Sequence, residues 1–355
     1  MLSFSQFISQ APDEAVLTTA PCRADLAGGT IDIWPLYLFH PGAVSVNIAL
    51  DIQTACRITP RAGPAIELRS HDTGREESFA SLAELMSASS YAHPLAAYLV
   101  RFFRPGEGFV LETHSESPAG AGISGSSALM IATAAALARF TGQEIEREQI
   151  RVIAQNVEAQ LIGVPTGCQD YYPAMYGGVN AIHLEVAGIR REPIAVPPDE
   201  INQRFVLFYT GAPRRSGINN WEVFKQHIDG NARVVSNFAS ISRIGQAMRQ
   251  ALAAQDWGSV ERLIDEEWQL RRTNAPGIAT STMDTLIEVA KGNGARAAKV
   301  CGAGGGGCVI ALIEKGARRQ VEAALRRHGG EPLDFRVARE GLCFHSVKAQ
   351  EAAQV

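Results

Sequence analysis

The chain has 355 residues, of which 46% are hydrophobic and 20% are charged, a composition typical of soluble globular proteins and unlike that of disordered chains. Its formal net charge is −4 and no stripe of Lys and Arg runs along it, which argues against nucleic-acid binding. The length favours two domains. Glycine is enriched, because 33 residues amount to about 9% of the chain against roughly 7% on average, and much of the excess lies in three short clusters.

The cysteine spacing and the apolar segments indicate the cellular compartment of the protein. The six cysteines are scattered without any CxxC pair, which is typical of reduced, buried thiols and not of a zinc or redox framework. No Lys or Arg precedes Arg23, so the N-terminal segment lacks the positive region of a secretory signal. The longest strongly apolar stretch, residues 128–138, is shorter than the roughly 20 residues of a membrane span. We therefore expect a cytoplasmic protein without a membrane partner.

The first half of the chain is rich in β-branched residues and in alternating patterns. These patterns predict strands over residues 15–19, 43–50, 51–61, 65–70, 109–115 and 179–186. Two helices are expected between the last two of these strands. One is rich in alanine and runs to about Phe140, and the other follows apolar residues at helical spacing from Ile145 to Leu161.

The second half of the chain is expected to begin after Pro197 and Pro198. A strand is predicted first, then three helical stretches, a second strand, a helix and two short strands. The first strand covers residues 204–210, the helical stretches 217–253, 257–272 and 281–292, and the second strand 308–314. This order predicts an α+β protein with two domains, residues 1–200 and residues 201–355.

The second glycine cluster, PAGAGISGSSA, spans residues 118–128. It contains a G-x-G-x-x-G pattern, but four residues separate its first glycine from the preceding strand and the region that follows is helical, so a dinucleotide fold is disfavoured. A Walker A loop would need a lysine, which the cluster lacks. The cluster instead leads into a helix N-terminus, which suits a nucleotide phosphate. A capped helix with a tight turn is the alternative.

Two more clusters complete a pattern. They are APCRADLAGGTID at residues 20–32 and KVCGAGGGGC at residues 299–308, and a GCQD loop lies between them at residues 167–170. With the second cluster, these segments resemble the motifs of the GHMP kinases, a family that includes galactokinase, homoserine kinase, mevalonate kinase and phosphomevalonate kinase. The resemblance runs from about residue 18 to about residue 345 and keeps the family's motif order.

The resemblance implies a fold and cofactors. It implies an ATP-binding N-terminal domain like domain 2 of ribosomal protein S5, residues 1–200, and a ferredoxin-like C-terminal domain, residues 201–355, with the active site in the cleft between them. ATP would be the phosphoryl donor, Mg²⁺ would accompany it, and the third glycine cluster would support the phosphate loop.

The resemblance also implies roles for individual residues. Asp170 would take the proton of the acceptor hydroxyl, with a helix-capping aspartate as the alternative. Arg23 would stabilise that base or the transferred charge, unless it forms a structural ion pair. Glu158 would hold magnesium together with Ser126 or Ser127, unless it is a solvated helix residue. The ATP phosphates would lie against Pro118, Gly120, Gly122, Ile123, Ser124, Gly125, Ser126, Ser127 and Ala128.

The acceptor side is indicated by Asp32, which matches the aspartate that hydrogen-bonds sugar hydroxyls in sugar-kinase members of the family. Trp34 and Tyr37 could pack on a sugar ring, and core packing explains them equally well. Arg214 could meet a phosphate on the acceptor, with a loop ion pair as the alternative. The residues expected to bind the acceptor are Gly29, Thr30, Asp32, Trp34, Tyr209 and Gly304.

The motifs also favour one branch of the family. Galactokinases carry Gly-Glu-His-Thr-Asp, whereas this chain has Gly-Gly-Thr-Ile-Asp at residues 28–32. The glycine run with Thr and Asp, the Gln169-Asp170 pair and the YTGAPRRS run at residues 209–216 resemble the bacterial heptose phosphate kinases and related fucose kinase domains. Ile31 and Tyr171 depart from that pattern. We expect an ATP- and magnesium-dependent sugar kinase that acts at the anomeric hydroxyl, with a heptose 7-phosphate as the first candidate acceptor.

Other functions stay open from the sequence. One is a galactokinase- or fucokinase-type kinase of another sugar, and another is a kinase of a small alcohol such as mevalonate or homoserine. A third is a non-catalytic sensor of ATP and sugar, against which Asp170, Arg23 and the paired serines argue. The sequence does not fix the oligomeric state, and a homodimer is compatible with it.

Overall fold

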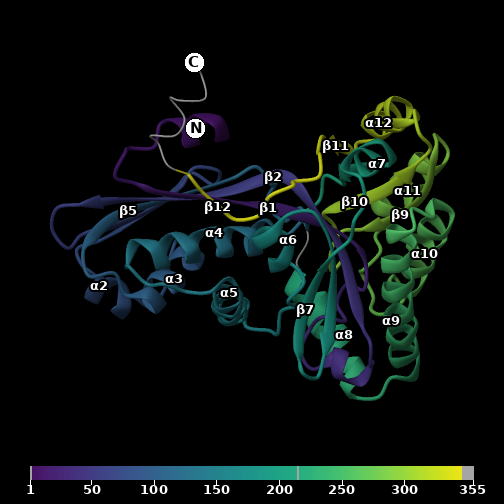
Figure 1. Cartoon of the computed structure of the whole chain (residues 1–355), viewed down its shortest axis with the longest axis horizontal. Coiled ribbons are helices and arrows are strands. Elements are labelled where there is room, and N and C mark those ends of the chain that lie inside the picture. Colours follow the sequence, from purple (N-terminus) through teal and green to yellow (C-terminus); the bar gives the residue numbers. More distant parts are fainter. Residues whose placement is uncertain (1, 214–215, 346–355) are drawn as a thin grey trace.

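The computed structural model describes residues 2–213 and 216–345, which build two β-sheets with helices packed on them (Figure 1). The larger sheet has eight strands in the order β12-β1-β2-β5-β3-β4, with β6 joined to β2 and β7 joined to β6. These strands are β1 (Val16–Ala27), β2 (Val44–Arg61), β3 (Ile66–Ser70), β4 (Arg75–Phe79), β5 (Gly108–Ser115), β6 (Val179–Glu185), β7 (Gly188–Pro193) and β12 (Cys343–His345).

Strand β2 is the longest strand of this sheet and holds it together. Its 18 residues pair antiparallel with β1, β5 and β6. Residues 44–50 are all buried, so both faces of this part of the strand are covered. Helices α4 (Gly125–Phe140) and α9 (Ala232–Ala253), which come from the two halves of the chain, both contact β2. The strand therefore belongs to the packing between the two halves.

Helix α4 is the central helix under the larger sheet (Figure 1). It contacts β1 and β2 on one side and α3 (Pro94–Phe103) and α5 (Arg147–Ile162) on the other. Because 11 of its 16 residues are buried, alanine suits it, since a small side chain allows neighbouring elements to approach closely. The short helices α2 (Leu82–Ser87) and α6 (Tyr171–Tyr176) complete this layer, and α1 (Phe4–Ser9) lies on the opposite face of the sheet.

The second half of the chain forms a smaller antiparallel sheet in the order β11-β8-β10-β9. Its strands are β8 (Phe205–Tyr209), β9 (Ala295–Val300), β10 (Cys308–Ile313) and β11 (Glu331–Leu333). Helix α10 (Trp257–Arg271) contacts both β9 and α9. The remaining helices are α7 (Pro198–Arg204), α8 (Ser216–Ile228), α11 (Ser281–Lys291) and α12 (Arg318–Arg327), and a short 3-10 helix spans Leu36–Phe39.

Most of the predicted elements are present, with differences that have local causes. The strands expected over residues 43–50 and 51–61 are one continuous strand, β2. The helical stretch expected over residues 217–253 is two helices, because Gly230 has φ +77 and the side chain of Asn231 caps α9 through the Val234 N–H. Strands β4, β7 and β9 and helices α1, α2, α3 and α7 were not predicted.

Near residue 200 the chain passes from the larger sheet to the smaller one, and it returns to the larger sheet at residues 343–345. Strand β12 leaves the second half and pairs antiparallel with β1, so residues 343–345 extend the first sheet and not the second. The division into domains of residues 1–200 and 201–355 stays a prediction of the sequence. In the part of the chain that the structure describes, no helix has the length and apolar character of a membrane span.

Candidate active site

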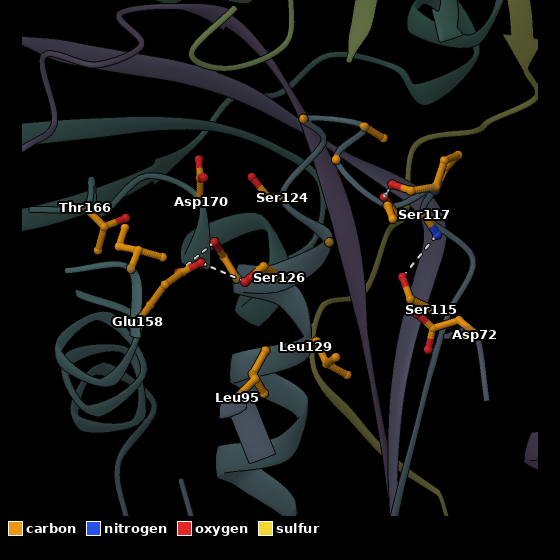
Figure 2. Close-up of a pocket in the computed structure, with 18 of the residues that line it drawn as sticks. Asp72, Leu95, Ser115, Ser117, Ser124, Ser126, Leu129, Glu158, Thr166 and Asp170 are labelled. Atoms are coloured by element: carbon orange, nitrogen blue, oxygen red, sulfur yellow. Dashed lines mark hydrogen bonds between the residues drawn. The ribbon is translucent and has the colours of Figure 1, made fainter. Parts of the chain in front are cut away.

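A cleft of about 390 Å³ lies where the glycine loop before α4 faces α5 and the loop before α6 (Figure 2). Nine residues expected at the site line it: Pro118, Gly120, Gly122, Ser124, Gly125, Ser126, Ser127, Glu158 and Asp170. Ile123 and Ala128 do not, because their apolar side chains are fully buried in the core. Since the first turn of α4 lines the cleft, its N–H groups and the helix dipole suit an anion such as a phosphate.

The loop keeps its shape through backbone contacts with two other motifs. Gly120 and Gly122 have φ +71 and +77, the left-handed region that favours glycine. The Arg23 N–H donates to the Ile123 carbonyl (2.9 Å), and the Cys308 N–H donates to the Ala121 carbonyl (2.6 Å). The third glycine cluster thus touches the phosphate loop, as the resemblance implies.

The buried Arg23 and the partly exposed Asp170 form an ion pair at one end of the cleft. The Arg23 Nη2 and Nε atoms lie 2.7 and 2.8 Å from Asp170 Oδ1, and Arg23 Nη1 donates to the Gly122 carbonyl (3.0 Å). Burial disfavours the charge of Arg23, but the carboxylates of Asp170 and Asp25 outweigh this effect and raise the pKa of Arg23. Asp170 takes the N-cap position of α6, yet its side chain makes no capping hydrogen bond. The capping alternative for Asp170 is therefore wrong.

Glu158 accepts hydrogen bonds from three hydroxyl groups at the end of the cleft where α4 begins (Figure 2). Ser126 Oγ donates to Glu158 Oε1 (2.9 Å), Ser127 Oγ donates to Oε2 (3.0 Å), and the Tyr171 hydroxyl also donates to Oε2. The side chain of Glu158 is buried, which raises its pKa. It is not the solvated helix glutamate of the alternative interpretation.

These oxygens fit magnesium in type and number. Mg²⁺ prefers hard oxygen ligands and is usually held by one or two carboxylates together with waters and the phosphates of a nucleotide. Glu158 with Ser126 and Ser127 offers such a partial set beside a phosphate loop. No group of three or more His, Cys, Asp or Glu side chains suited to a metal occurs among the described residues.

Asp32 lies against the loop that carries Asp170. Its Oδ2 accepts a hydrogen bond from the Gln169 N–H (2.9 Å), and its side chain is almost fully buried. A Cβ atom on Gly167 would lie 2.0 Å from Asp32 Oδ2, so this approach requires glycine. Burial, reinforced by the charge of Asp170, raises the pKa of Asp32 to about 6. Two carboxyl groups, one buried and one ion-paired, thus share this corner of the molecule.

None of the residues expected to bind an acceptor, Asp32 included, is among those that line the cleft. Trp34 is 64% exposed and Tyr37 is buried, so the structure gives no shared ring-stacking surface for these two side chains. Tyr209 pairs with Cys308 in the smaller sheet, and Gly304 approaches the Ile278 carbonyl closely. Arg214 lies outside the described residues.

Gly29 and Thr30 connect instead to the second half of the chain. A Cβ atom on Gly29 would lie 2.4 Å from Arg271 Nη1, and Arg271 Nη2 donates to Thr30 Oγ1 (3.1 Å). Thr30 Oγ1 also donates to Asn220 Oδ1 (3.4 Å), and Asn220 lines the cleft. The first glycine cluster is therefore held by α8 and α10.

Sequence reasoning missed several of these contacts. Tyr171, noted only as a departure from the family pattern, donates to Glu158. Arg271, Asn220 and the N–H of Gln169 were not singled out, because each acts on a residue far away in the chain. The one usable signal was local, since Tyr171 directly follows Asp170.

Two parts of the chain match domains of a known protein family. Residues 90–178 match the N-terminal domain of the GHMP kinases and residues 248–331 match their C-terminal domain. The chain belongs to the GHMP kinases. This GHMP kinase is a small-molecule kinase, as predicted, and its two-domain α+β fold is that of the family. GHMP kinases use ATP as phosphoryl donor.

The individual proteins that this chain resembles are named for different substrates. The GHMP kinase is 25% identical to a D-glycero-alpha-D-manno-heptose 7-phosphate kinase of Campylobacter jejuni, over 93% of this chain and 98% of the relative. It is also 25% identical to a mevalonate kinase of Pyrococcus horikoshii, over 94% and 98%. The structure of Lactococcus lactis galactokinase complexed with galactose superposes with a TM-score of 0.77 at 18% identity, covering 93% of this chain and 95% of that one.

Proposed function

We propose that this GHMP kinase transfers the γ-phosphoryl group of ATP to the anomeric hydroxyl of a sugar, with a heptose 7-phosphate as the first candidate acceptor. The observation that carries the proposal is the ion pair of Arg23 and Asp170 at the end of a cleft lined by a phosphate loop. Phosphoryl transfer to an alcohol requires positioning, charge neutralisation and an acceptor for the hydroxyl proton, and this cleft offers a group for each.

Asp170 is the proton acceptor in this proposal. Its carboxylate takes the proton of the acceptor hydroxyl while the hydroxyl oxygen bonds to the γ-phosphorus, and the bond from that phosphorus to the bridging oxygen breaks to release ADP. Arg23 is fixed by the Gly122 carbonyl and by Asp170, so its positive charge stays beside the transferred group without reorganisation.

The phosphate loop and α4 bind the nucleotide. The N–H groups at the start of α4 face the phosphates, and the contacts of Ala121 and Ile123 with Cys308 and Arg23 keep the loop in place. Glu158, Ser126 and Ser127 would hold Mg²⁺. When bound, Mg²⁺ neutralises charge on the β- and γ-phosphates.

Asp32 recognises the acceptor in this proposal. A carboxylate can accept hydrogen bonds from two neighbouring hydroxyls, and a sugar offers such a pair. An alcohol with a single hydroxyl near the reacting carbon does not. The 25% identity with a heptose 7-phosphate kinase over nearly the whole chain supports a phosphorylated heptose as the first acceptor to test.

The test is a panel of acceptors with MgATP and the purified full-length protein. ADP release would be measured with a heptose 7-phosphate, unphosphorylated heptose, galactose, fucose, mevalonate and homoserine. We expect turnover with a sugar, and a ³¹P NMR signal of the product coupled to the anomeric proton.

Three results would contradict the proposal. Turnover of mevalonate or homoserine without any sugar activity would make the protein a kinase of small alcohols, which the similarity to a mevalonate kinase makes the second candidate. Phosphorylation of a sugar at another hydroxyl would refute the anomeric assignment. Sugar-dependent ATP binding without any turnover would indicate a sensor. A cytoplasmic location and a homodimer stay predictions of the sequence.

A further inference from the structure

Ser124 has an unusual backbone conformation for a residue with a side chain. Its φ and ψ are +62° and +32°, in the left-handed region where a Cβ atom is unfavourable. Gly120 and Gly122, earlier in the same loop, have similarly positive φ values, and there no side chain opposes them. Glycine at position 124 would meet this requirement without strain, so the presence of serine calls for an explanation.

The hydroxyl of Ser124 adds a second unfavourable feature. Only 5% of the residue is exposed, and Oγ is buried without any hydrogen-bond partner among the described residues. Ser124 precedes α4 as its N-cap residue, yet its side chain does not cap the helix. A buried hydroxyl without a partner destabilises the folded protein, so such groups usually have a partner that the isolated chain does not contain.

The position of Ser124 indicates what that partner is. The residue lines the cleft, and Figure 2 shows its side chain between Asp170 and the start of α4. The hydroxyls of the neighbouring serines already have an acceptor, because Ser126 and Ser127 both donate to Glu158. Asp170 provides an acceptor for a hydroxyl proton, whereas a phosphoryl group needs donors. Strain retained in such a place is typical of functional sites.

We propose that Ser124 Oγ donates a hydrogen bond to a non-bridging oxygen of the phosphoryl group during its transfer, and that Ser124 is therefore a catalytic residue. The proposal rests on the proposed phosphoryl transfer and goes beyond it, since the phosphate loop as such acts through backbone N–H groups. It also explains the strain, because glycine would relieve it but would lack the donor.

Two substitutions separate the hydroxyl from the backbone. Ser124→Ala removes the hydroxyl and keeps a Cβ atom, and Ser124→Gly removes both. Because a hydrogen bond to a charged group is lost in each, we expect kcat to fall about 10- to 100-fold in both variants. The dissociation constant of ADP should stay within about twofold, because ADP lacks the transferred group. Ser124→Gly should also raise the midpoint of thermal unfolding by about 2 °C.

Gln255→Gly is the matched control. Gln255 is an exposed residue with φ +54 in the turn between α9 and α10, so glycine relieves the same kind of strain there. We expect a similar rise in the unfolding midpoint with kcat unchanged. This control shows whether strain relief alone alters turnover.

Two results would overturn the assignment. If kcat of both Ser124 variants stays within about threefold of the native value, the hydroxyl does not contact the transferred group. If the affinity for ADP falls together with kcat, Ser124 binds the phosphates that remain on the nucleotide. A failure of the sugar proposal looks different, because the native protein itself would then turn over no sugar, and the variants would be measured with the acceptor that it does use.

Discussion

Lys299 Nζ lies 2.7 Å from Asp25 Oδ1, and neither side chain is exposed to solvent. Lys299 also lies 3.0 Å from Glu267 Oε1, and Arg271 Nη1 lies 2.8 Å from Asp25 Oδ2. Burial opposes the charge of Asp25, but Lys299 and Arg271 outweigh it and lower the pKa of Asp25 to about 2. This group of charges joins the first glycine cluster, at Asp25 in β1, to α10 and to the third glycine cluster, at Lys299 in β9.

The cluster predicts a large loss of stability when one charge is removed. Lys299→Met leaves two carboxylates buried with a single cation, which should lower the free energy of unfolding by about 3–5 kcal/mol. Chemical denaturation of the full chain measures the effect. Lys291→Met is the control, because its pair with Asp265 is partly exposed and should contribute at most about 1 kcal/mol. Equal losses in the two variants would contradict the structural role of Lys299.

Asp170→Asn tests the proton acceptor. Asparagine keeps the size of the side chain and can still accept a hydrogen bond from Arg23, but it cannot take the hydroxyl proton at neutral pH. We expect kcat to fall about 10²- to 10⁴-fold with the dissociation constant of ATP nearly unchanged. Asp284→Asn, at a carboxylate paired with Arg272 on the surface, should leave kcat at the native value. A small change of kcat in Asp170→Asn would refute the assignment.

Asp32 predicts a pH dependence of acceptor binding. With its pKa at about 6, the carboxyl group of the free protein is ionised above this pH and protonated below it. Because an ionised carboxylate accepts hydrogen bonds from two hydroxyls, KM for the sugar should rise as the pH falls through about 6. Steady-state kinetics between pH 5 and 8 measure this, because the range extends to both sides of that pKa. A flat KM over this range would show that Asp32 does not bind the sugar as an anion.

The same pKa predicts how Asp32 affects stability. The folded-state pKa, about 6, lies above the ordinary value of 3.8, so the folded protein binds the proton more tightly and loses stability as the pH rises through this window. Asp32→Asn resembles the protonated acid. It should therefore increase the free energy of unfolding at pH 8, by at most about 3 kcal/mol, with the difference shrinking toward pH 4. Denaturation of the native protein and of Asp32→Asn at pH 8 and pH 4 measures this difference. A variant less stable than the native protein at pH 8 would contradict the raised pKa of Asp32.

Glu158→Gln tests the magnesium site. The amide keeps an oxygen for one serine but loses the negative charge, so the magnesium concentration for half-maximal rate at saturating ATP should rise about tenfold or more. Glu148→Gln is the control on the same helix, because Glu148 lies partly exposed beside Arg151 and does not line the cleft. An unchanged magnesium requirement in Glu158→Gln would place the metal elsewhere.

The sequence by itself determined the features that depend on neighbouring residues. The alanine-rich helix α4 and the glycine loop before it follow local patterns, because glycines at 120 and 122 permit backbone angles that other residues resist. Family resemblance added the correct fold and enzyme class. The same local patterns misjudged continuity, since β2 is one strand and not two.

Only the tertiary structure decided which distant groups meet. Arg23 and Asp170 are separated by 147 positions, and Asp25 and Lys299 by 274. The strained backbone of Ser124, its hydroxyl without a partner in residues 2–213 and 216–345, and the return of β12 to the first sheet have no local signal either. Such pairings arise from strand register and from the packing of the two halves of the chain. In the low-dielectric interior, a paired charge stabilises the fold and shifts pKa values, whereas an unpaired hydroxyl costs free energy.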